Sequence, residues 1–382
     1  MLRSPLAARW NTRVRQYTEI MSFFAELANF LTAALQSLPF MALAVLGYLA
    51  VRNSALKPVA IAWLMLLMLG FSLFSFGMTM TGVMDLSGIQ AGDAGASRSG
   101  VFLPDARGVV ATGLFGVAFG LSLGCLGFAP AVRRMLARFT PIDPTSFVQM
   151  LALVSVVSLT ILCVTPLIAT GQPPLLKLLA QMSGAQTPAL GQSGDSMTRT
   201  EAYTLIWQVP CAILAVGLGL KRNFTESLKR LGFVKPTLRQ VALGVATAVV
   251  MVVLVTVFGK GISALWGYLG WSTTDETQVN KLMSFAFNPV SALVVAVVAG
   301  LGEELTVRGV LQPRLGLLLP NLFFASLHAF QYNFDALLLV FVVGLALAVL
   351  RSRTNTTTSA IAHGSYDFIL LMLTTLQVPW FK

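Results

Sequence analysis

The chain has 382 residues, of which 56% are hydrophobic and only 11% are charged. A soluble domain has about 25% charged residues, so this composition excludes an ordinary soluble protein and indicates a membrane protein. The net charge of +11 does not indicate nucleic-acid binding, because the Lys and Arg residues cluster in short connections between apolar runs. We therefore expect a chain embedded in the lipid bilayer, with no nucleic-acid partner.

Long, continuous apolar segments follow one another from end to end, which is typical of membrane-spanning helices. They lie near residues 22–51, 58–84, 108–132, 147–170, 202–220, 240–268, 286–307, 314–332, 334–350 and 357–377. The sequence predicts an all-α polytopic membrane protein with about 9–10 transmembrane helices. Two polar stretches rich in Gly, Ser and Pro, near residues 85–107 and 171–201, are expected to be loops.

Prolines predict interruptions in two of the segments. Pro39 lies inside the first apolar segment. Either this segment turns back at Pro39 and leaves the membrane on the side where it entered, or the basic tail before it is an amphipathic helix at the membrane interface. Pro320 and Asn321 predict a fresh helix starting near Asn321, because proline ends a helix and Asn is a good N-cap.

Basic residues orient the chain in the membrane. If the connection holding Arg52 and Lys57 is cytoplasmic and the segments alternate, the inside connections hold about twice as many Lys and Arg residues as the outside ones. This orientation places the end of the segment at 286–307 on the cytoplasmic side. The four basic residues of the N-terminal tail are the exception.

Ionisable side chains divide the chain into two parts. Residues 1–222 form apolar spans without candidate site residues, and we treat them as an N-terminal transmembrane extension of unknown role. Residues 223–382 hold every candidate and are predicted to form a C-terminal helical bundle around a membrane-embedded polar site. Ionisable side chains at membrane depth are costly and by default mark function.

The first group of candidates is Glu303, Glu304 and Arg308. Glu304 and Arg308 are four residues apart on one helix face and are expected to pair, while Glu303 is rotated about 100° away and stays free for chemistry. The alternative is a helix end whose charges reach the interface. The sequence alone does not decide which Glu would act as a base.

The second group is His328, His363 and Asp367, which includes the only two histidines of the chain. Asp367 follows His363 by one turn and can orient its imidazole. Helix lengths counted from the cytoplasmic side bring both groups to similar depths, so we expect them to meet. Each histidine alone could instead make an interhelical hydrogen bond.

Two kinds of chemistry fit this set. Glu303, His328, His363 and Asp367 could ligate zinc through nitrogen and carboxylate donors. The same residues could hold a water molecule for a Glu general base without any metal.

The motifs Glu303-Glu304-x-x-x-Arg308, Phe324-x-x-x-His328 and His363-x-x-x-Asp367 stand in this order. They resemble those of the CAAX protease and bacteriocin-processing (Abi) family, which is related to the Ras-converting CAAX endopeptidase. The resemblance covers roughly residues 285–370. One departure is Asp367, which stands where the family has Asn and donates no amide hydrogen bond; a carboxylate better suits a metal ligand or a proton partner.

The resemblance implies an intramembrane endopeptidase, either a metalloprotease or a metal-independent glutamate protease. In that reading Glu303 and His328 position and deprotonate the attacking water, while His363 and Asp367 stabilise the oxyanion or complete the site. The implied substrate is a membrane-embedded peptide or protein. The implied location is a bacterial plasma membrane, with the active site opening to the cytoplasm.

Two other functions are compatible with parts of this pattern. A non-catalytic bacteriocin immunity protein or membrane scaffold would need the fold but not the complete set of site residues. A proton-coupled transporter could use the same ionisable cluster as a relay, but such proteins often contain inverted repeats, and none is visible in the sequence.

Overall fold

The computed structural model describes residues 5–83, 106–183 and 194–378, and the regular elements in these residues are all helices. The predicted all-α polytopic membrane fold is confirmed. Among the described residues, seven helices are long and apolar enough to cross a membrane. They are Ile20–Arg52, Ser54–Val83, Ala106–Phe128, Phe147–Thr170, Leu238–Leu269, Pro289–Leu315 and Phe334–Arg353.

The prediction of about 9–10 crossings also counted three segments that do not meet this criterion. The helices found there are α7 (Gly194–Ala215), α13 (Leu318–Leu327) and α15 (Thr356–Thr375). α13 is short, whereas α7 and α15 carry many polar residues. The polar residues of α15 include His363 and Asp367 of the candidate site.

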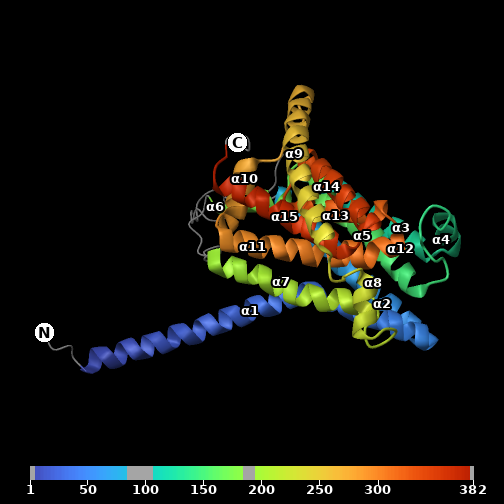
Figure 1. Cartoon of the computed structure of the whole chain (residues 1–382), viewed down its shortest axis with the longest axis horizontal. Helices are drawn as coiled ribbons and strands as arrows, with labels where there is room; N and C mark the ends of the chain where they lie inside the picture. The colour runs from blue at the N-terminus through green and yellow to red at the C-terminus, as the bar shows by residue number, and fades with distance from the viewer. Residues whose placement is uncertain (1–4, 84–105, 184–193, 379–382) are drawn as a thin grey trace.

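The N-terminal helix α1 (Pro5–Arg52) is continuous, and Pro39 lies inside it. Of the two alternatives for this segment, the re-entrant turn at Pro39 is wrong, since neighbouring packing can hold a helix together around one missing hydrogen bond. The N-terminal end of α1 extends away from the other helices (Figure 1). Its C-terminal half is fastened to α2, where Trp63 Nε1 donates to Pro39 O at 2.9 Å.

The remaining helices of the N-terminal part pack around α5 (Phe147–Thr170), which contacts both α2 (Lys57–Val83) and α3 (Ala106–Cys125). Shorter elements connect them: η1 (Ser54–Leu56), η3 (Leu126–Phe128), α4 (Pro130–Leu136) and α6 (Pro174–Ser183). The loop predicted at 171–201 is wrong in part, because α6 and the start of α7 fall within it. The loop predicted at 85–107 lies outside the described residues, apart from its last two residues, which begin α3.

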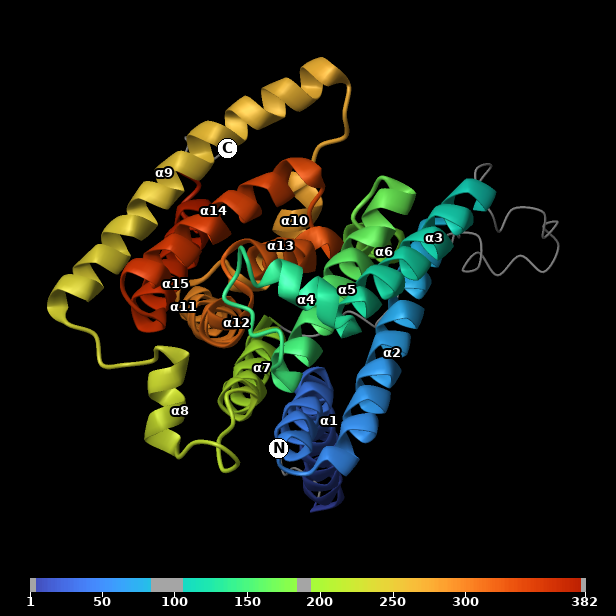
Figure 2. The same ribbon diagram turned by 90° about the vertical axis from the view of Figure 1, so that its right-hand side faces the viewer.

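The C-terminal part is a second group of helices. Before α13 come α8 (Phe224–Leu231), α9 (Leu238–Leu269), α10 (Glu276–Met283), η5 (Ser284–Ala286), α11 (Pro289–Val298), η6 (Ala299–Leu311) and α12 (Gln312–Leu315). After it come η7 (His328–Phe330), α14 (Phe334–Arg353) and α15. The long helix α9 runs along the outside, beside α14 and α15 (Figure 2), and α15 packs inward against α11 and η6.

A fresh helix starts near Asn321 as predicted, because α13 begins three residues earlier, at Leu318, but the predicted N-cap role of Asn321 is wrong. Pro320 then lies in the first turn, where a backbone N–H has no helical partner and its loss costs little. Asn321 is buried inside the helix and its Nδ2 donates to Phe341 O of α14 at 2.9 Å. The asparagine thus joins two helices instead of capping one.

The two parts of the chain pack against each other. α7 contacts α1, α11 and η6, and α13 contacts α5. Arg314 reinforces this junction, because its Nη2 donates to Ala215 O at 2.7 Å and to Tyr48 Oη at 3.0 Å. The predicted domain boundary at residue 222 lies in the connection between α7 and α8, and the division into two domains stays a prediction.

Candidate active site

The candidate residues Glu303, Glu304 and Arg308 lie on η6, which is wound as a π-helix. π-helices are rare and often occur at functional sites. The sequence pattern was interpreted as an α-helix, and composition alone does not distinguish the two. The pairing of Glu304 with Arg308 is nevertheless present: Arg308 Nη1 lies 3.0 Å from Glu304 Oε1, and both side chains are fully buried.

Glu304 is the central residue of the cluster. Its Oε1 also accepts from His363 Nδ1 at 3.0 Å, and its Oε2 accepts from the Ser359 hydroxyl. A buried carboxylate is stable only when such partners satisfy it. Ser359 was not among the predicted residues, although its position four residues before His363 on α15 places it on the same helix face.

Arg308 is held by more than its carboxylate partner. Its Nη2 donates to Gly344 O of α14 at 2.9 Å, and the guanidinium lies over the Phe324 ring, 4.3 Å from the ring centre. A cation over an aromatic face is attracted by the ring electrons. The motif residue Phe324, which had no assigned role, therefore helps to stabilise the buried charge.

His363 is almost completely buried and faces carboxylates with both ring nitrogens. Nδ1 contacts Glu304, while Nε2 lies 3.5 Å from Asp367 Oδ2 and 3.9 Å from Glu303 Oε2. A carboxylate on one nitrogen fixes the orientation and the tautomer of an imidazole. The arrangement thus aims Nε2 at Glu303 and Asp367.

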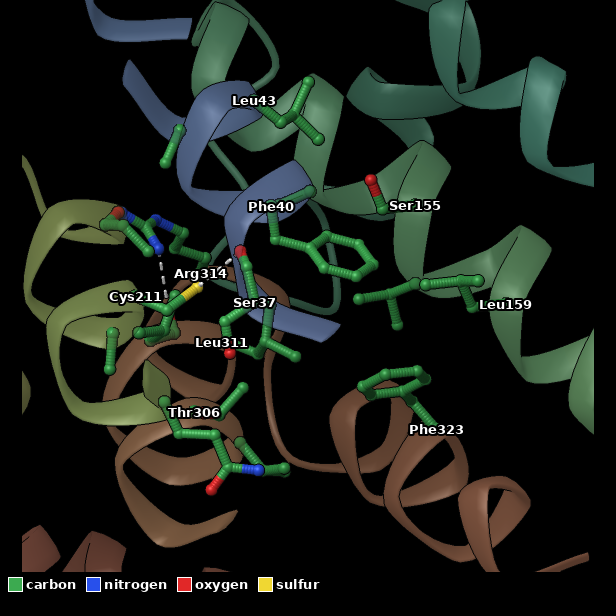
Figure 3. A pocket seen from close by; sticks show the side chains of 18 of the residues that line it. Ser37, Phe40, Leu43, Ser155, Leu159, Cys211, Thr306, Leu311, Arg314 and Phe323 are labelled. Carbon is green, nitrogen blue, oxygen red and sulfur yellow. Dashed lines mark hydrogen bonds between the residues drawn. The ribbon is translucent and has the colours of Figure 1, made fainter. Parts of the chain in front are cut away.

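Glu303 differs from Glu304 in what surrounds it. Its side chain is 34% exposed, against 0% for Glu304. Glu303 also lines a cavity of about 350 Å³ between η6 and helices α1, α5, α7 and α13, part of which is drawn in Figure 3. Of the two glutamates, Glu303 is therefore the one that a bound molecule can reach.

His328 lies apart from the other candidates, at the end of α13. Its Nδ1 is 3.0 Å from Phe324 O, and its ring is parallel to that of Tyr332 at 6.1 Å. The Phe324 ring lies edge-on to both histidines, 5.0 Å from His328 and 5.9 Å from His363. No contact found within the described parts of the chain joins His328 directly to Glu303 or His363.

The zinc site that the sequence suggested as one alternative was compared with the positions of its four candidate ligands. Within the described residues, no group of three or more His, Cys, Asp and Glu side chains is placed to hold a metal ion. His328 lies across Phe324 from the rest, and Nδ1 of His363 is occupied by Glu304. The proposed donors do not fit zinc as a set, so no step is derived through a metal.

The close approach of α15 to η6 depends on Gly300. A methyl carbon added to Gly300 would lie 2.7 Å from Ala360 O and 2.9 Å from Gly364 N, both of them backbone atoms. We expect Gly300→Ala to destabilise the protein by about 1–3 kcal/mol, because the helices must separate. Thermal unfolding in detergent measures this. The control is Gly261→Ala on α9, where nothing lies within 4 Å, and equal stability of the two variants would contradict the expectation.

Comparison with known protein families agrees with this geometry. Residues 285–369 match the family model described as Type II CAAX prenyl endopeptidase Rce1-like, and the matched segment contains all six candidate residues. Searches of curated proteins and of solved structures each returned no match to the chain. Residues 285–369, which hold the candidate site, are therefore similar to the Rce1-like CAAX endopeptidases, and this match supports membership of the CAAX protease and bacteriocin-processing family.

Proposed function

We propose that the protein is an intramembrane endopeptidase that hydrolyses a peptide bond of a membrane-associated protein or peptide with a water molecule activated by Glu303. The observation that carries the proposal is the difference between the two glutamates. Glu304 is enclosed by Arg308, His363 and Ser359, whereas Glu303 lines the cavity. A general base must reach the proton that it removes.

The proposed reaction uses the protein's own groups. Glu303 takes a proton from water while the water oxygen attacks the carbonyl carbon of the peptide bond. His363 acts here as an imidazolium: its Nδ1–H donates to Glu304, and its Nε2–H, aimed towards Glu303, stabilises the negative oxygen that forms. The proton then passes from Glu303 to the leaving nitrogen as the C–N bond breaks, which yields a carboxyl group and an amine.

His328 has a secondary role in this scheme. If its Nδ1–H donates to Phe324 O, the neutral ring leaves Nε2 as an acceptor for a water hydrogen. Asp367, 3.5 Å from His363 Nε2, takes the place of the amide of the family pattern and holds the imidazole through charge. Both assignments follow from the family resemblance and from the distances given above.

The proposed setting is a bacterial plasma membrane with the active site opening to the cytoplasm. The excess of basic residues in the connections assigned to the cytoplasm supports this orientation. The substrate would then reach the cavity from the bilayer or from its cytoplasmic surface.

The experiment that tests the function compares two strains by mass spectrometry of membrane proteins and small peptides. One strain carries the unmodified protein and the other carries Glu303→Ala at an equal protein level. New termini that depend on Glu303 would support a protease and identify its substrate. Identical peptide profiles, with a cellular phenotype that survives the substitution, would instead favour an immunity or scaffold protein.

Removal of metal ions gives a separate prediction. Because the proposed base and its partners are protein groups, the purified protein should keep its turnover after treatment with a zinc chelator. Loss of a catalytic metal would remove the Lewis acid and abolish turnover. Turnover that is lost on chelation and restored by added zinc would show that the site rearranges to bind the ion.

A further inference from the structure

The cavity beside Glu303 is formed jointly by the two parts of the chain. The N-terminal part supplies apolar side chains from α1 and α5, among them Phe40, Leu43 and Leu159, and Figure 3 shows Phe40 opposite Phe323 of α13. Helix α7 supplies a further wall. The family match begins only at residue 285, so most of the residues that line the cavity lie outside it.

One polar residue of α7 has no partner for its side-chain oxygen. Gln208 lines the cavity, and its Oε1 is buried without a hydrogen bond in the part of the chain that the structure describes. The same oxygen lies against Gly302, where an added methyl carbon would collide with it. Because Gly302 directly precedes Glu303, the amide of Gln208 lies beside the backbone that carries the proposed base.

We propose that Gln208 is a substrate-positioning residue, and that the cavity binds an apolar peptide segment whose backbone N–H donates to Gln208 Oε1. This proposal rests on the proposed function and names the class of its substrate. Buried carbonyl oxygens are almost always paired, so an orphan oxygen on a residue that lines a cavity suits a ligand that brings a donor. A hydrocarbon chain has no donor, whereas an extended peptide presents N–H groups along its length.

The walls of the cavity suit the rest of such a segment. Binding sites combine mostly apolar surfaces with a few polar groups that set the orientation of the ligand. Here the apolar side chains of α1, α5 and α13 would take the side chains of the peptide, and Gln208 would set its register against Glu303. The N-terminal spans then form the substrate-binding half of the enzyme.

The test measures peptide binding separately from hydrolysis. Full-length protein carrying Glu303→Gln, which is expected to bind without turnover, is titrated with a short fluorescent peptide of Leu, Ala and Ser residues. Adding Gln208→Leu is expected to weaken binding about 10-fold, the effect of one lost hydrogen bond. The matched control is Gln278→Leu, since the Oε1 of Gln278 is also buried and unpartnered but lies outside the cavity, and it should leave binding unchanged.

A modified peptide identifies the donor. Each backbone N–H of the peptide is replaced in turn by an ester oxygen. In the protein with Gln208, one of these peptides should bind more weakly than the unmodified peptide. In the Gln208→Leu protein, the same ester peptide should bind as well as the unmodified one. Ester effects that are the same in both proteins would overturn the proposal, and so would equal binding by the Gln208→Leu and Gln278→Leu proteins.

A second variant keeps the test valid if Gln208→Leu does not fold. Gly302→Ala pushes the glutamine amide away from its place, so it should weaken binding to a similar extent without removing any polar group. Unchanged binding in Gly302→Ala would count against the proposal.

Hydrolysis by the unmodified protein is measured alongside. If binding depends on Gln208 but no peptide is hydrolysed, the proposed protease function is contradicted and the proposed binding site is supported. If the peptide is hydrolysed but its binding does not depend on Gln208, the protease function is supported and the role of Gln208 is contradicted.

Discussion

Replacing Glu303 with Gln is expected to lower turnover of a cleavable peptide by about 10²- to 10⁴-fold, the usual contribution of a general base. The substitution keeps the size of the side chain but removes the group that accepts the proton from water. Because Glu303 is 34% exposed and lines the cavity, the fold should not depend on its charge. The measurement is kcat for the purified protein in detergent, together with its thermal unfolding temperature.

Two companion variants sharpen this result. Glu304→Gln should lower stability as well as turnover, because Glu304 holds Arg308, His363 and Ser359 together. Gln278→Leu, outside the cavity, should change neither. Full turnover by a correctly folded Glu303→Gln protein would show that this glutamate is not the base.

Replacing Arg308 with Met is expected to destabilise the protein by about 3–5 kcal/mol, because it leaves Glu304 as a buried charge without its cation. The substitution also removes the hydrogen bond from the guanidinium to Gly344 O and its contact with the Phe324 ring. Denaturant or thermal unfolding in detergent measures the loss. Turnover should fall in parallel with the folded fraction.

The control for this prediction is the Glu26–Arg199 ion pair between α1 and α7. That pair has the same chemistry, but its side chains are 30% and 48% exposed. Arg199→Met should therefore have a much smaller effect, since water screens and solvates exposed charges. The double variant Glu304→Gln/Arg308→Met should recover part of the stability, because no unpaired buried charge remains. Equal effects of Arg308→Met and Arg199→Met would contradict the importance of burial.

The class of fold and the approximate place of the candidate site follow from the amino-acid pattern without any tertiary information. Continuous apolar runs require helices in a bilayer, because each backbone group must be paired within its own segment. The ionisable residues inside those runs identified the cluster, because charged side chains at membrane depth are costly and usually have a function. The pairing of Glu304 with Arg308 followed from a spacing of four residues, which brings two side chains together on one helix face.

The arrangement of the candidate site depends on contacts between helices that are distant in the chain. Which glutamate is enclosed depends on Ser359 and His363 of α15, more than fifty residues away along the chain. Likewise, Gln208 lies beside Gly302 only because α7 packs on η6, and no local pattern encodes that contact.

The errors in helix boundaries have the same origin. Pro39 and Asn321 were interpreted from local preference, yet each lies inside a helix. Packing partners such as Trp63, or an acceptor on a neighbouring helix, outweigh the small energies of capping and of one lost hydrogen bond. Local preference acts within a turn or two of the chain, whereas helix packing brings together residues from distant segments, and in this protein those contacts position the chemistry.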